Sequence, residues 1–312
     1  MTGGVAAWGL CATVMAPVDQ VQAFVAHHLA LGCARLWLFL DQPDDPAVRA
    51  VAGLAEVTVT ICDAAYWQTI KGKRPEKHQN RQARNMQAVY AGADLPWIGH
   101  IDVDEFLSPR RDIGDVLAEV AQDRPMLRMA PWEALHDAGL PPDIFTARSF
   151  RRALKGPENA ALRDLAFGPY APLLREGVLS HSAGKCFFRT GIAGLEPRLH
   201  GAFLAGRRLD GGTFAPDVAL LHFHAEDRQR WLDRLAYRIT RGAYQFNPDL
   251  ANWLAGADDA ALAVFYDRVQ SPDHRVRAGL IAAGALISVD LGLRNRVGLQ
   301  ILPDHKPQGM QT

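Results

Sequence analysis

The 312-residue sequence has no excess of either charge, because 34 lysines and arginines balance 34 aspartates and glutamates. A protein that binds nucleic acid by releasing counterions needs a broad positive surface, so the balance excludes that class and leaves room only for a local patch. Cysteine is scarce, and no CxxC spacing joins Cys11, Cys33, Cys62 and Cys186. The pattern predicts reduced, mostly buried thiols in a cytoplasmic protein, and neither a disulfide framework nor a zinc site.

Long hydrophobic runs are also lacking. Val5–Val18 is apolar, but no lysine or arginine precedes it, which favours a buried strand over a signal peptide. Ala278–Val289 ends at Asp290, well short of the roughly 20 residues that cross a bilayer. We expect a packed helix there. A helix lying on a membrane surface is the alternative, so peripheral membrane association stays open.

Apolar strands alternate with helical stretches through the first half of the chain. Strands are expected at 8–16, 34–40, 57–62 and 97–103, and helices at 18–31, 78–92 and 113–120. This order predicts an α/β fold with a Rossmann-like, mostly parallel sheet flanked by helices. Later strands are expected at 184–190 and 218–224, and helices from Arg228 onward. We therefore expect a catalytic domain over 1–230 and a helical C-terminal cap over 231–312.

The clearest local motif is an apolar strand that runs into three carboxylates, Asp102, Asp104 and Glu105. In a strand, residues i and i+2 point to the same face, so Asp102 and Asp104 are expected to project together and Glu105 away from them. Two carboxylates side by side repel each other unless a cation lies between them. Mg²⁺ or Mn²⁺ bound through such carboxylates keeps positions open for phosphate oxygens. The alternative is a solvated strand end, because an isolated DxD string is common.

These residues resemble the core of family-2-like bacterial glycosyltransferases. Ala83-Arg84-Asn85, a helix, and the DVDEFL string after a strand carry the likeness, with Asp41 and Asp44-Asp45 after the second strand. The resemblance implies a GT-A-like fold over about residues 8–230, a nucleotide-sugar donor, and a divalent cation, Mn²⁺ or Mg²⁺, held by the DxD motif. Such proteins usually carry Asn-Glu after the first strand, where this sequence has Ala16-Pro17-Val18.

The resemblance also implies donor-binding residues. Asp41 would bind the base or ribose, while Arg84 and Asn85 would line the donor cleft, with Arg84 near the diphosphate or orienting Asp102. For Asp41 the alternative is an aspartate that begins the turn at Pro43, and for Arg84 it is a solvated helix face. A guanidinium group suits phosphate geometry. Lys185 could meet a phosphate as a point charge, or be an ordinary exposed lysine.

Histidine and carboxylate candidates complete the expected site. His222 and His224 alternate on a late strand and face one way, so either could complete the metal shell; His200 is a further candidate. A lone strand histidine is more often structural. An inverting transfer needs a carboxylate base for the acceptor hydroxyl, and Glu133 or Asp137 could serve.

The sequence therefore predicts a metal-dependent glycosyltransferase that moves a sugar from a nucleotide-sugar donor to a saccharide, glycan-precursor or other hydroxyl acceptor. A metal-dependent hydrolase or phosphoesterase that uses Asp102, Asp104, His222 and His224 is one alternative, and a non-catalytic glycosyltransferase-like binding protein is another. No Gly-x-Ser-x-Gly elbow and no GxxxxGK[ST] loop occurs. The sequence therefore supports neither a serine-nucleophile triad nor a Walker-type phosphate-binding loop.

Overall fold

The computed structural model describes residues 4–42, 46–137, 139–141, 143–209 and 211–300. The chain folds into two compact units, of which the first contains 1–130, 184–220 and 292–312 and the second contains 131–183 and 221–291. These boundaries differ from the expected division at residue 230. The assignment of a donor-binding domain and a helical cap therefore stays a prediction.

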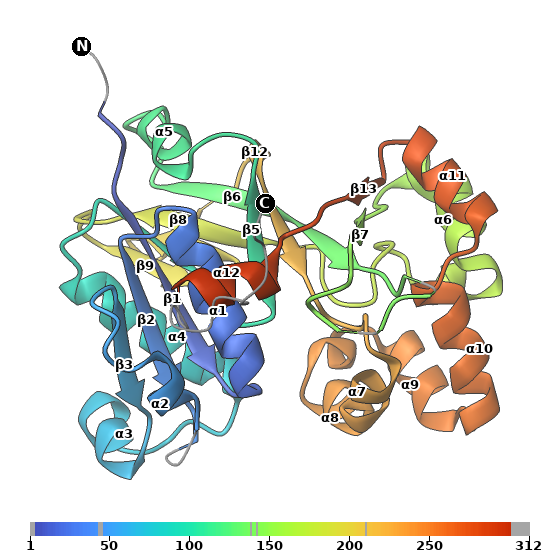
Figure 1. Ribbon diagram of the computed structural model, residues 1–312, viewed down its shortest axis with the longest axis horizontal. Helices are drawn as coiled ribbons and strands as arrows, with labels where there is room; N and C mark the ends of the chain where they lie inside the picture. The colour runs from blue at the N-terminus through green and yellow to red at the C-terminus, as the bar shows by residue number, and fades with distance from the viewer. Residues whose placement is uncertain (1–3, 43–45, 138, 142, 210, 301–312) are drawn as a thin grey trace, which may run out of the picture. The chain divides into compact units, whose positions relative to one another are not determined.

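The first unit contains a mostly parallel sheet flanked by helices, which confirms the predicted α/β class (Figure 1). Strands β3, β2, β1 and β4 lie side by side in this order and run parallel, and β8 is antiparallel to both β4 and β6 (Met126–Ala134). The elements of this unit are β1 (Trp8–Val14), α1 (Val18–Ala30), β2 (Arg35–Leu40), α2 (Ala47–Val51), β3 (Val57–Ile61), α3 (Ala64–Lys71), α4 (His78–Gly92), β4 (Trp97–His100), β5 (Glu105–Pro109), α5 (Ile113–Ala118), β8 (Lys185–Arg189), β9 (Leu195–Arg198), β10 (Gly201–Leu204), β11 (Arg207–Arg208) and α12 (Leu293–Gln300).

Two strands, β6 (Met126–Ala134) and β12 (Phe214–His222), pass from one unit into the other along the chain. The first residues of β6 pair with β8 in the first unit, and its last residues pair with β7 (Ser149–Arg152) in the second. Strand β12 extends from 214 to 222, so it begins earlier and ends earlier than the strand expected at 218–224.

The expected strand at 97–103 is wrong at its end. Strand β4 stops at His100, and β5 begins at Glu105. Between them the chain makes a turn in which the Glu105 N–H donates to the Asp102 carbonyl oxygen at 2.9 Å. Because Asp102 and Asp104 lie in a turn, the alternation of a strand does not decide where their side chains point.

Buried apolar side chains from the sheet and its helices form the core of the first unit. Trp67 and Trp97 are almost fully buried, and helix α4 packs against β1. All four cysteines are free and buried, as expected from their spacing. One cluster of this core consists of Cys11, Phe39, Cys62, Trp67, Met86, Val89, Ile98, Met126, Cys186, Phe188, Leu195 and Ala202.

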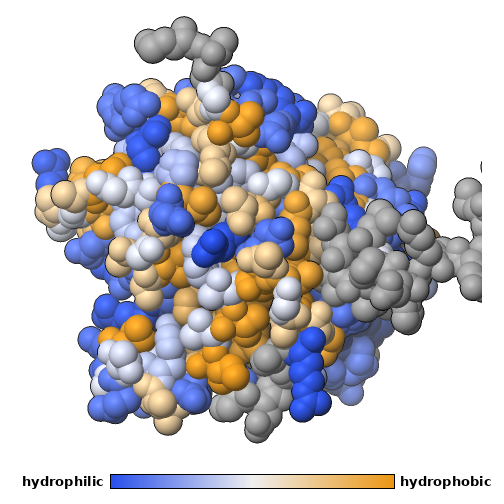
Figure 2. All heavy atoms as spheres, turned by 60° about the vertical axis from the view of Figure 1, so that its left-hand side comes forward, coloured by the Kyte–Doolittle hydropathy of each residue, from blue (hydrophilic) through white to orange (hydrophobic). Residues whose placement is uncertain are grey.

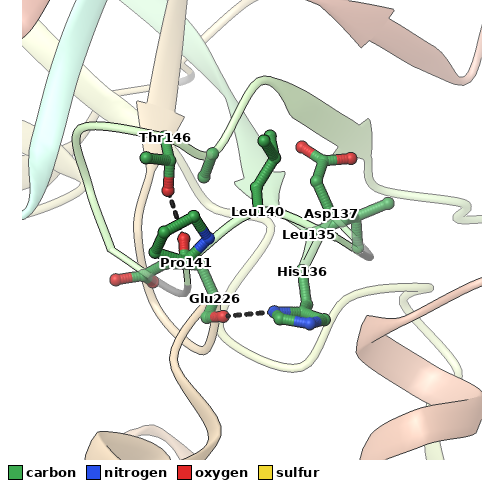
Figure 3. A pocket seen from close by; sticks show the side chains of 8 residues that line it. Leu135, His136, Asp137, Leu140, Pro141, Thr146 and Glu226 are labelled. Carbon is green, nitrogen blue, oxygen red and sulfur yellow. Dashed lines mark hydrogen bonds between the residues drawn. The ribbon is translucent and has the colours of Figure 1, made fainter.

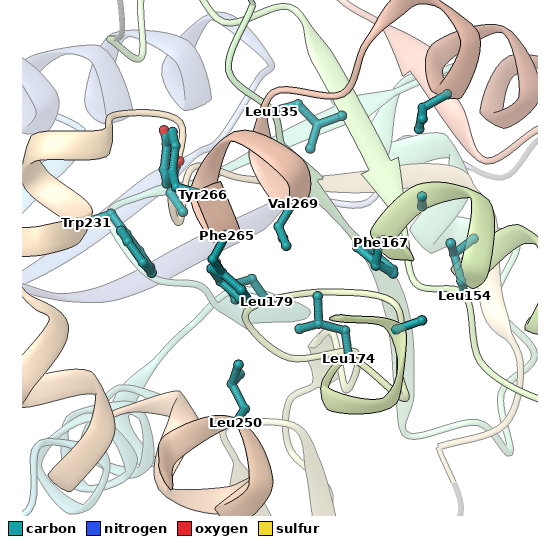
Figure 4. Packing of buried hydrophobic residues seen from close by; sticks show 14 of the residues in the cluster. Leu135, Leu154, Phe167, Leu174, Leu179, Trp231, Leu250, Phe265, Tyr266 and Val269 are labelled. Atoms are coloured by element: carbon teal, nitrogen blue, oxygen red, sulfur yellow. The ribbon is translucent and has the colours of Figure 1, made fainter. Parts of the chain in front are cut away.

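The second unit is mainly helical and has a core of its own, in which Trp231, Phe265 and Tyr266 pack together (Figure 4). Its short strands β7 and β13 pair antiparallel. The elements of this unit are β7 (Ser149–Arg152), η1 (Pro157–Asn159), α6 (Ala160–Phe167), η2 (Gly168–Leu173), α7 (Arg228–Asp233), α8 (Leu235–Thr240), η3 (Ala243–Phe246), α9 (Pro248–Gly256), α10 (Asp259–Gln270), α11 (His274–Ala282) and β13 (Leu286–Ser288).

The apolar run Ala278–Val289 is only partly the helix that was expected. Helix α11 ends at Ala282, Gly284 adopts a positive φ of 59°, and the chain continues as strand β13. Among the described residues, no helix has both the length and the apolar character needed to cross a membrane. Hydrophilic and hydrophobic residues are interspersed over the face shown in Figure 2.

Candidate functional site

The strand order of the first unit marks one edge of its sheet. Strands β2 and β3 lie on one side of β1 and β4 lies on the other, so the order reverses between β1 and β4. In open α/β sheets, ligands bind outside the carboxyl ends of the strands at such a reversal. Asp41 directly follows β2, and Asp102 follows β4 by two residues. Both carboxylates therefore belong to the edge where this topology places a ligand.

Asp102 is held from three directions. The Gln82 side-chain amide of helix α4 donates to its Oδ1, and Lys185 Nζ of strand β8 lies 2.7 Å from its Oδ2. The Asp102 backbone N–H donates to Glu105 Oε2 at 2.7 Å. The expectation that Glu105 projects away from Asp102 is therefore wrong, because the turn brings the two residues together.

Lys185 is buried and ion-paired, so the alternative of an exposed lysine is wrong. Its side chain is 2% exposed, and its Nζ lies 3.5 Å from Glu105 Oε2 as well as next to Asp102. The register that pairs Gly99 with Phe187 in antiparallel strands brings the start of β8 beside the end of β4. The residue before Lys185 is Gly184, with φ of +71°, and a Cβ there would collide with the Met129 carbonyl oxygen. The backbone thus fixes where the ammonium group lies.

The charges of this cluster act strongly on one another. Burial alone would raise the pKa of the Asp102 carboxyl, but the Lys185 ammonium outweighs it and holds that pKa well below its usual range. Burial and the charge of Lys185 lower the pKa of His100 to about 3, so this buried imidazole is neutral. Asp104 is half-buried and also acts on Lys185 electrostatically. One ammonium group thus faces three carboxylates, those of Asp102, Asp104 and Glu105.

Asp41 has a different set of partners from those expected. Arg81 forks onto its carboxylate, with Nε 2.9 Å from Oδ1 and Nη2 2.6 Å from Oδ2, and Arg74 Nη2 lies 2.9 Å from Oδ1. Burial would raise the pKa of Asp41, but hydrogen bonds from His78, Arg81 and Arg74 lower it to about 2. Both oxygens thus have partners within the chain. The turn at Pro43 and the aspartates Asp44 and Asp45 lie outside the described residues.

Helix α4 turns a polar face toward the sheet edge. Asn85 is fully buried, donates to Thr13 Oγ1 at 2.8 Å and accepts from the Tyr66 hydroxyl at 2.7 Å. Arg84 points to the exposed side of the helix, where it donates to Gln87 at 3.2 Å. The expectation that Arg84 orients Asp102 is therefore wrong, and Gln82 has that position. A donor contact by Asn85 stays a prediction.

Sequence reasoning missed Gln82 and Arg81, although a signal for them was present. Asn85 comes three residues after Gln82 and four after Arg81, so the three share one face of a helix. Sequence reasoning instead placed Arg84 beside Asn85 in the donor cleft. A stripe centred on Asn85 would have included both missed residues and left Arg84 out.

Three histidines of the second unit lie close together. The rings of His222 and His224 have centroids 5.3 Å apart, and His181, which the sequence did not single out, lies 5.5 Å from His222. His224 Nε2 is 3.0 Å from the Tyr244 hydroxyl, and burial lowers the pKa of His224 well below its usual value. His222 and His224 belong to the second unit and Asp102 and Asp104 to the first, so their joint metal role stays a prediction.

His200 belongs to the first unit and lies between β9 and β10. Its Nδ1 is 2.7 Å from the Gly184 carbonyl oxygen. Burial and the charge of Lys185 lower the pKa of His200 to about 4, so its ring is neutral at pH 7. A neutral imidazole is the form that ligates metals, and its role as a ligand stays a prediction.

The two carboxylates expected to act as the base are engaged elsewhere. Glu133 is 1% exposed, accepts from the backbone N–H groups of Leu179 and Ser180, and lies 3.1 Å from Arg151 Nη2. Because its oxygens are buried and bonded, Glu133 is unsuited to take a proton from an acceptor. Asp137 accepts from Ser149 Oγ at 2.6 Å and pairs with Arg277 at 2.9 Å. Despite burial, these contacts lower the pKa of Asp137, which makes it a weaker base.

A small pocket in the second unit lies beside Asp137 (Figure 3). His136 approaches the Glu226 carbonyl oxygen at 3.3 Å across it, and Leu140 and Pro141 close another side. The hollow has no enclosed space for even a water-sized molecule, so we assign no substrate to it.

No family model matches the chain, and no curated protein matches it significantly. Many solved structures show weak likeness, three of them as follows. HddC from Yersinia pseudotuberculosis is 11% identical over 47% of this chain and 69% of its own, with a TM-score of 0.29. CMP:2-keto-3-deoxy-manno-octonic acid synthetase complexed with CTP is 16% identical over 41% of this chain and 53% of its own, with a TM-score of 0.27. S. aureus TarS 1–349 is 10% identical over 88% of this chain and 74% of its own, with a TM-score of 0.31. Likeness at this level carries no argument about the chemistry of this chain.

Proposed function

We propose that the protein is a metal-dependent glycosyltransferase that moves a sugar from a nucleotide-sugar donor to a hydroxyl acceptor. The observation that carries the proposal is the acidic turn, defined as residues 102–105, at the reversal point of the parallel strands. A ligand at this edge meets the partly exposed carboxylates of Asp102 and Asp104, with Glu105 and Lys185 buried behind them. Such a set suits a diphosphate only together with a cation, because carboxylates repel phosphate oxygens.

The chemistry of the donor atoms fits a hard divalent cation. Carboxylate oxygens are the ligands that Mg²⁺ and Mn²⁺ prefer. The Lys185 ammonium already lies against Asp102 and Glu105, which shows that this turn accommodates a positive charge. Asp102 and Asp104 would hold the ion. When bound, the ion would neutralise negative charge on the leaving diphosphate.

The remaining roles fall to residues of the chain itself. Lys185 would attract the diphosphate as a point charge, and Gln82 would keep Asp102 oriented. Asp41 and Asn85 are bonded within the chain, so their contact with a donor would need those bonds to rearrange. We assign no base for the acceptor, because Glu133 and Asp137 are both engaged.

A nucleotide-release assay tests the proposal. The chain is incubated with UDP-, GDP- and CMP-sugars, with Mn²⁺ or with EDTA, and free nucleotide is measured with and without saccharide acceptors. We expect release from one donor class that needs the metal and falls sharply in Asp104→Ala. Asp123→Ala, which removes an exposed carboxylate of the same unit, is the matched control. Full activity in EDTA or in Asp104→Ala would contradict the proposal. Mn²⁺ binding with no response to any nucleotide would favour a metal-dependent hydrolase.

A further inference from the structure

We infer that Lys185 is a positioning residue that occupies the place of a divalent cation in the acidic turn and sets how tightly that cation binds. The inference rests on the proposed function in taking the acidic turn as the metal site. It concerns a residue that would touch the diphosphate only after the ion and the donor have arrived.

The first observation is the closed set of contacts around Asp102. Lys185 Nζ lies 2.7 Å from Asp102 Oδ2 and 3.5 Å from Glu105 Oε2, and the same Glu105 oxygen accepts the Asp102 backbone N–H at 2.7 Å. A cation that ligates Asp102 Oδ2 must therefore displace the ammonium group or share the carboxylate with it. Lysine and metal compete for one oxygen.

The second observation is the burial of the competitor. The Lys185 side chain is 2% exposed, whereas that of Asp102 is 26% exposed. The ammonium thus approaches the carboxylates from inside the protein, and the solvent side of Asp102 stays reachable. His100 precedes Asp102 by two residues and is buried, and neither of its ring nitrogens has a hydrogen-bond partner among the described residues. A buried polar side chain without a hydrogen bond therefore lies next to the acidic turn along the chain.

The charge balance gives the consequence. Removing the ammonium takes away the positive charge that Lys185 places against both Asp102 and Glu105, and at short range in a protein interior the repulsion between these carboxylates is strong. A divalent cation then meets one more net negative charge and no longer competes with Lys185 for Asp102 Oδ2. The affinity for Mn²⁺ should rise, and the protein should depend on Mn²⁺ for stability.

Direct Mn²⁺ titration without nucleotide tests the inference. Mn²⁺ affinity is measured by calorimetry, and the melting temperature is followed with and without Mn²⁺, in the full chain and in Lys185→Met. We expect the variant to bind Mn²⁺ about tenfold more tightly or better, and to regain on Mn²⁺ addition the melting temperature that it loses without the ion. Affinity equal to or weaker than that of the unmodified chain overturns the inference.

Control variants separate this effect from a general loss of lysine. Lys155→Met removes a lysine whose ion pair with Glu176 is about half exposed, and its Mn²⁺ response should match that of the unmodified chain. Lys185→Arg keeps the charge, so its affinity should stay within about threefold. If Lys185→Met does not fold, Lys185→Gln removes the charge but keeps a hydrogen-bond donor, and it must show the same gain. A tenfold gain in Lys185→Arg or Lys155→Met, or none in the foldable neutral variant, refutes the role.

The readouts keep the two proposals distinct. Tighter Mn²⁺ binding in the neutral variants, together with no nucleotide release from any donor, would support the role of Lys185 and contradict the proposed glycosyltransferase activity. Metal-dependent release from a nucleotide-sugar, together with unchanged Mn²⁺ affinity in Lys185→Met, would do the opposite.

Discussion

Each unit contains a buried ion pair, and the two pairs differ in how their charges are balanced. In the second unit, one carboxylate, Glu133, meets one guanidinium, Arg151, and accepts two further backbone N–H groups. In the first unit, one ammonium, Lys185, faces three carboxylates. A balanced pair whose carboxylate oxygens both accept hydrogen bonds holds the fold together. A cluster with surplus negative charge at a sheet edge attracts a cation.

The largest effect is expected at the balanced pair. Arg151→Met leaves Glu133 buried without its cation, and breaking a buried pair in this way costs about 3–5 kcal/mol. Urea unfolding should show a loss of that size, and Glu133→Gln combined with Arg151→Met should recover part of it. A loss below about 1 kcal/mol would mean that the two pairs do not differ in the way described.

The next effect concerns the acidic turn. Asp102→Asn keeps the shape of the side chain and the Gln82 contact but removes the charge that would hold the ion. We expect nucleotide release, measured as kcat/KM, to fall roughly 10²–10³-fold, as for other groups that stabilise developing charge. Asp123→Asn serves as control. If Asp102→Asn unfolded the protein as severely as Arg151→Met, the first cluster would be structural as well.

Asp41 is a third case, in which positive partners are in surplus. Its folded pKa is about 2 and the ordinary value is about 3.9, so its carboxylate stabilises the fold above pH 4, and this contribution is lost as the pH falls toward 2. Asp41→Asn should cost about 1–3 kcal/mol at pH 7, because Arg81 loses its charged partner. Acid titration of stability should be flatter between pH 4 and 2 in the variant. Identical slopes in both proteins would disprove the assignment.

The smallest effect is expected at Arg84, which provides an exposed reference. Arg84→Ala should change the free energy of unfolding by no more than about 0.5 kcal/mol. It should also leave nucleotide release within about twofold, because the side chain bonds only Gln87 among the described residues. A fall of more than tenfold would instead restore the donor-cleft role that the family resemblance implies.

The elements that the sequence predicts best are those with a clear hydrophobic pattern along their length. Helix α4 has the expected bounds, His78–Gly92, and β1 is buried along its whole length, as a run without charges indicates. The face of α4 was predicted less well, because hydrophobic periodicity counts apolar residues. The face in question buries Arg81, Gln82 and Asn85, whose cost of burial is met by hydrogen bonds that no local pattern encodes.

The acidic turn is a second place where the sequence predicts the residues but not their contacts. The sequence identifies Asp102 and Asp104, but β4 ends at His100 and the turn reverses the direction expected for Glu105. Lys185 lies 83 positions further along the chain and reaches Asp102 through antiparallel pairing of β8 with β4. Such a contact depends on the order of the strands in the sheet, which a single sequence does not specify. The bonds of Glu133 were equally beyond the sequence, because Arg151 and the N–H groups that bind it come from other segments.

The backbone at Gly184 determines where Lys185 lies relative to the acidic turn, which matters for the design of the same cluster in another protein. With its left-handed conformation and the Met129 carbonyl oxygen so near, no other amino acid fits there without moving strand β6 or β8. Transplanting Lys185 alone would therefore fail. Gly184 has to be transferred together with Lys185. In a library that randomises position 184, we expect most variants to lose the contact between Lys185 and Asp102.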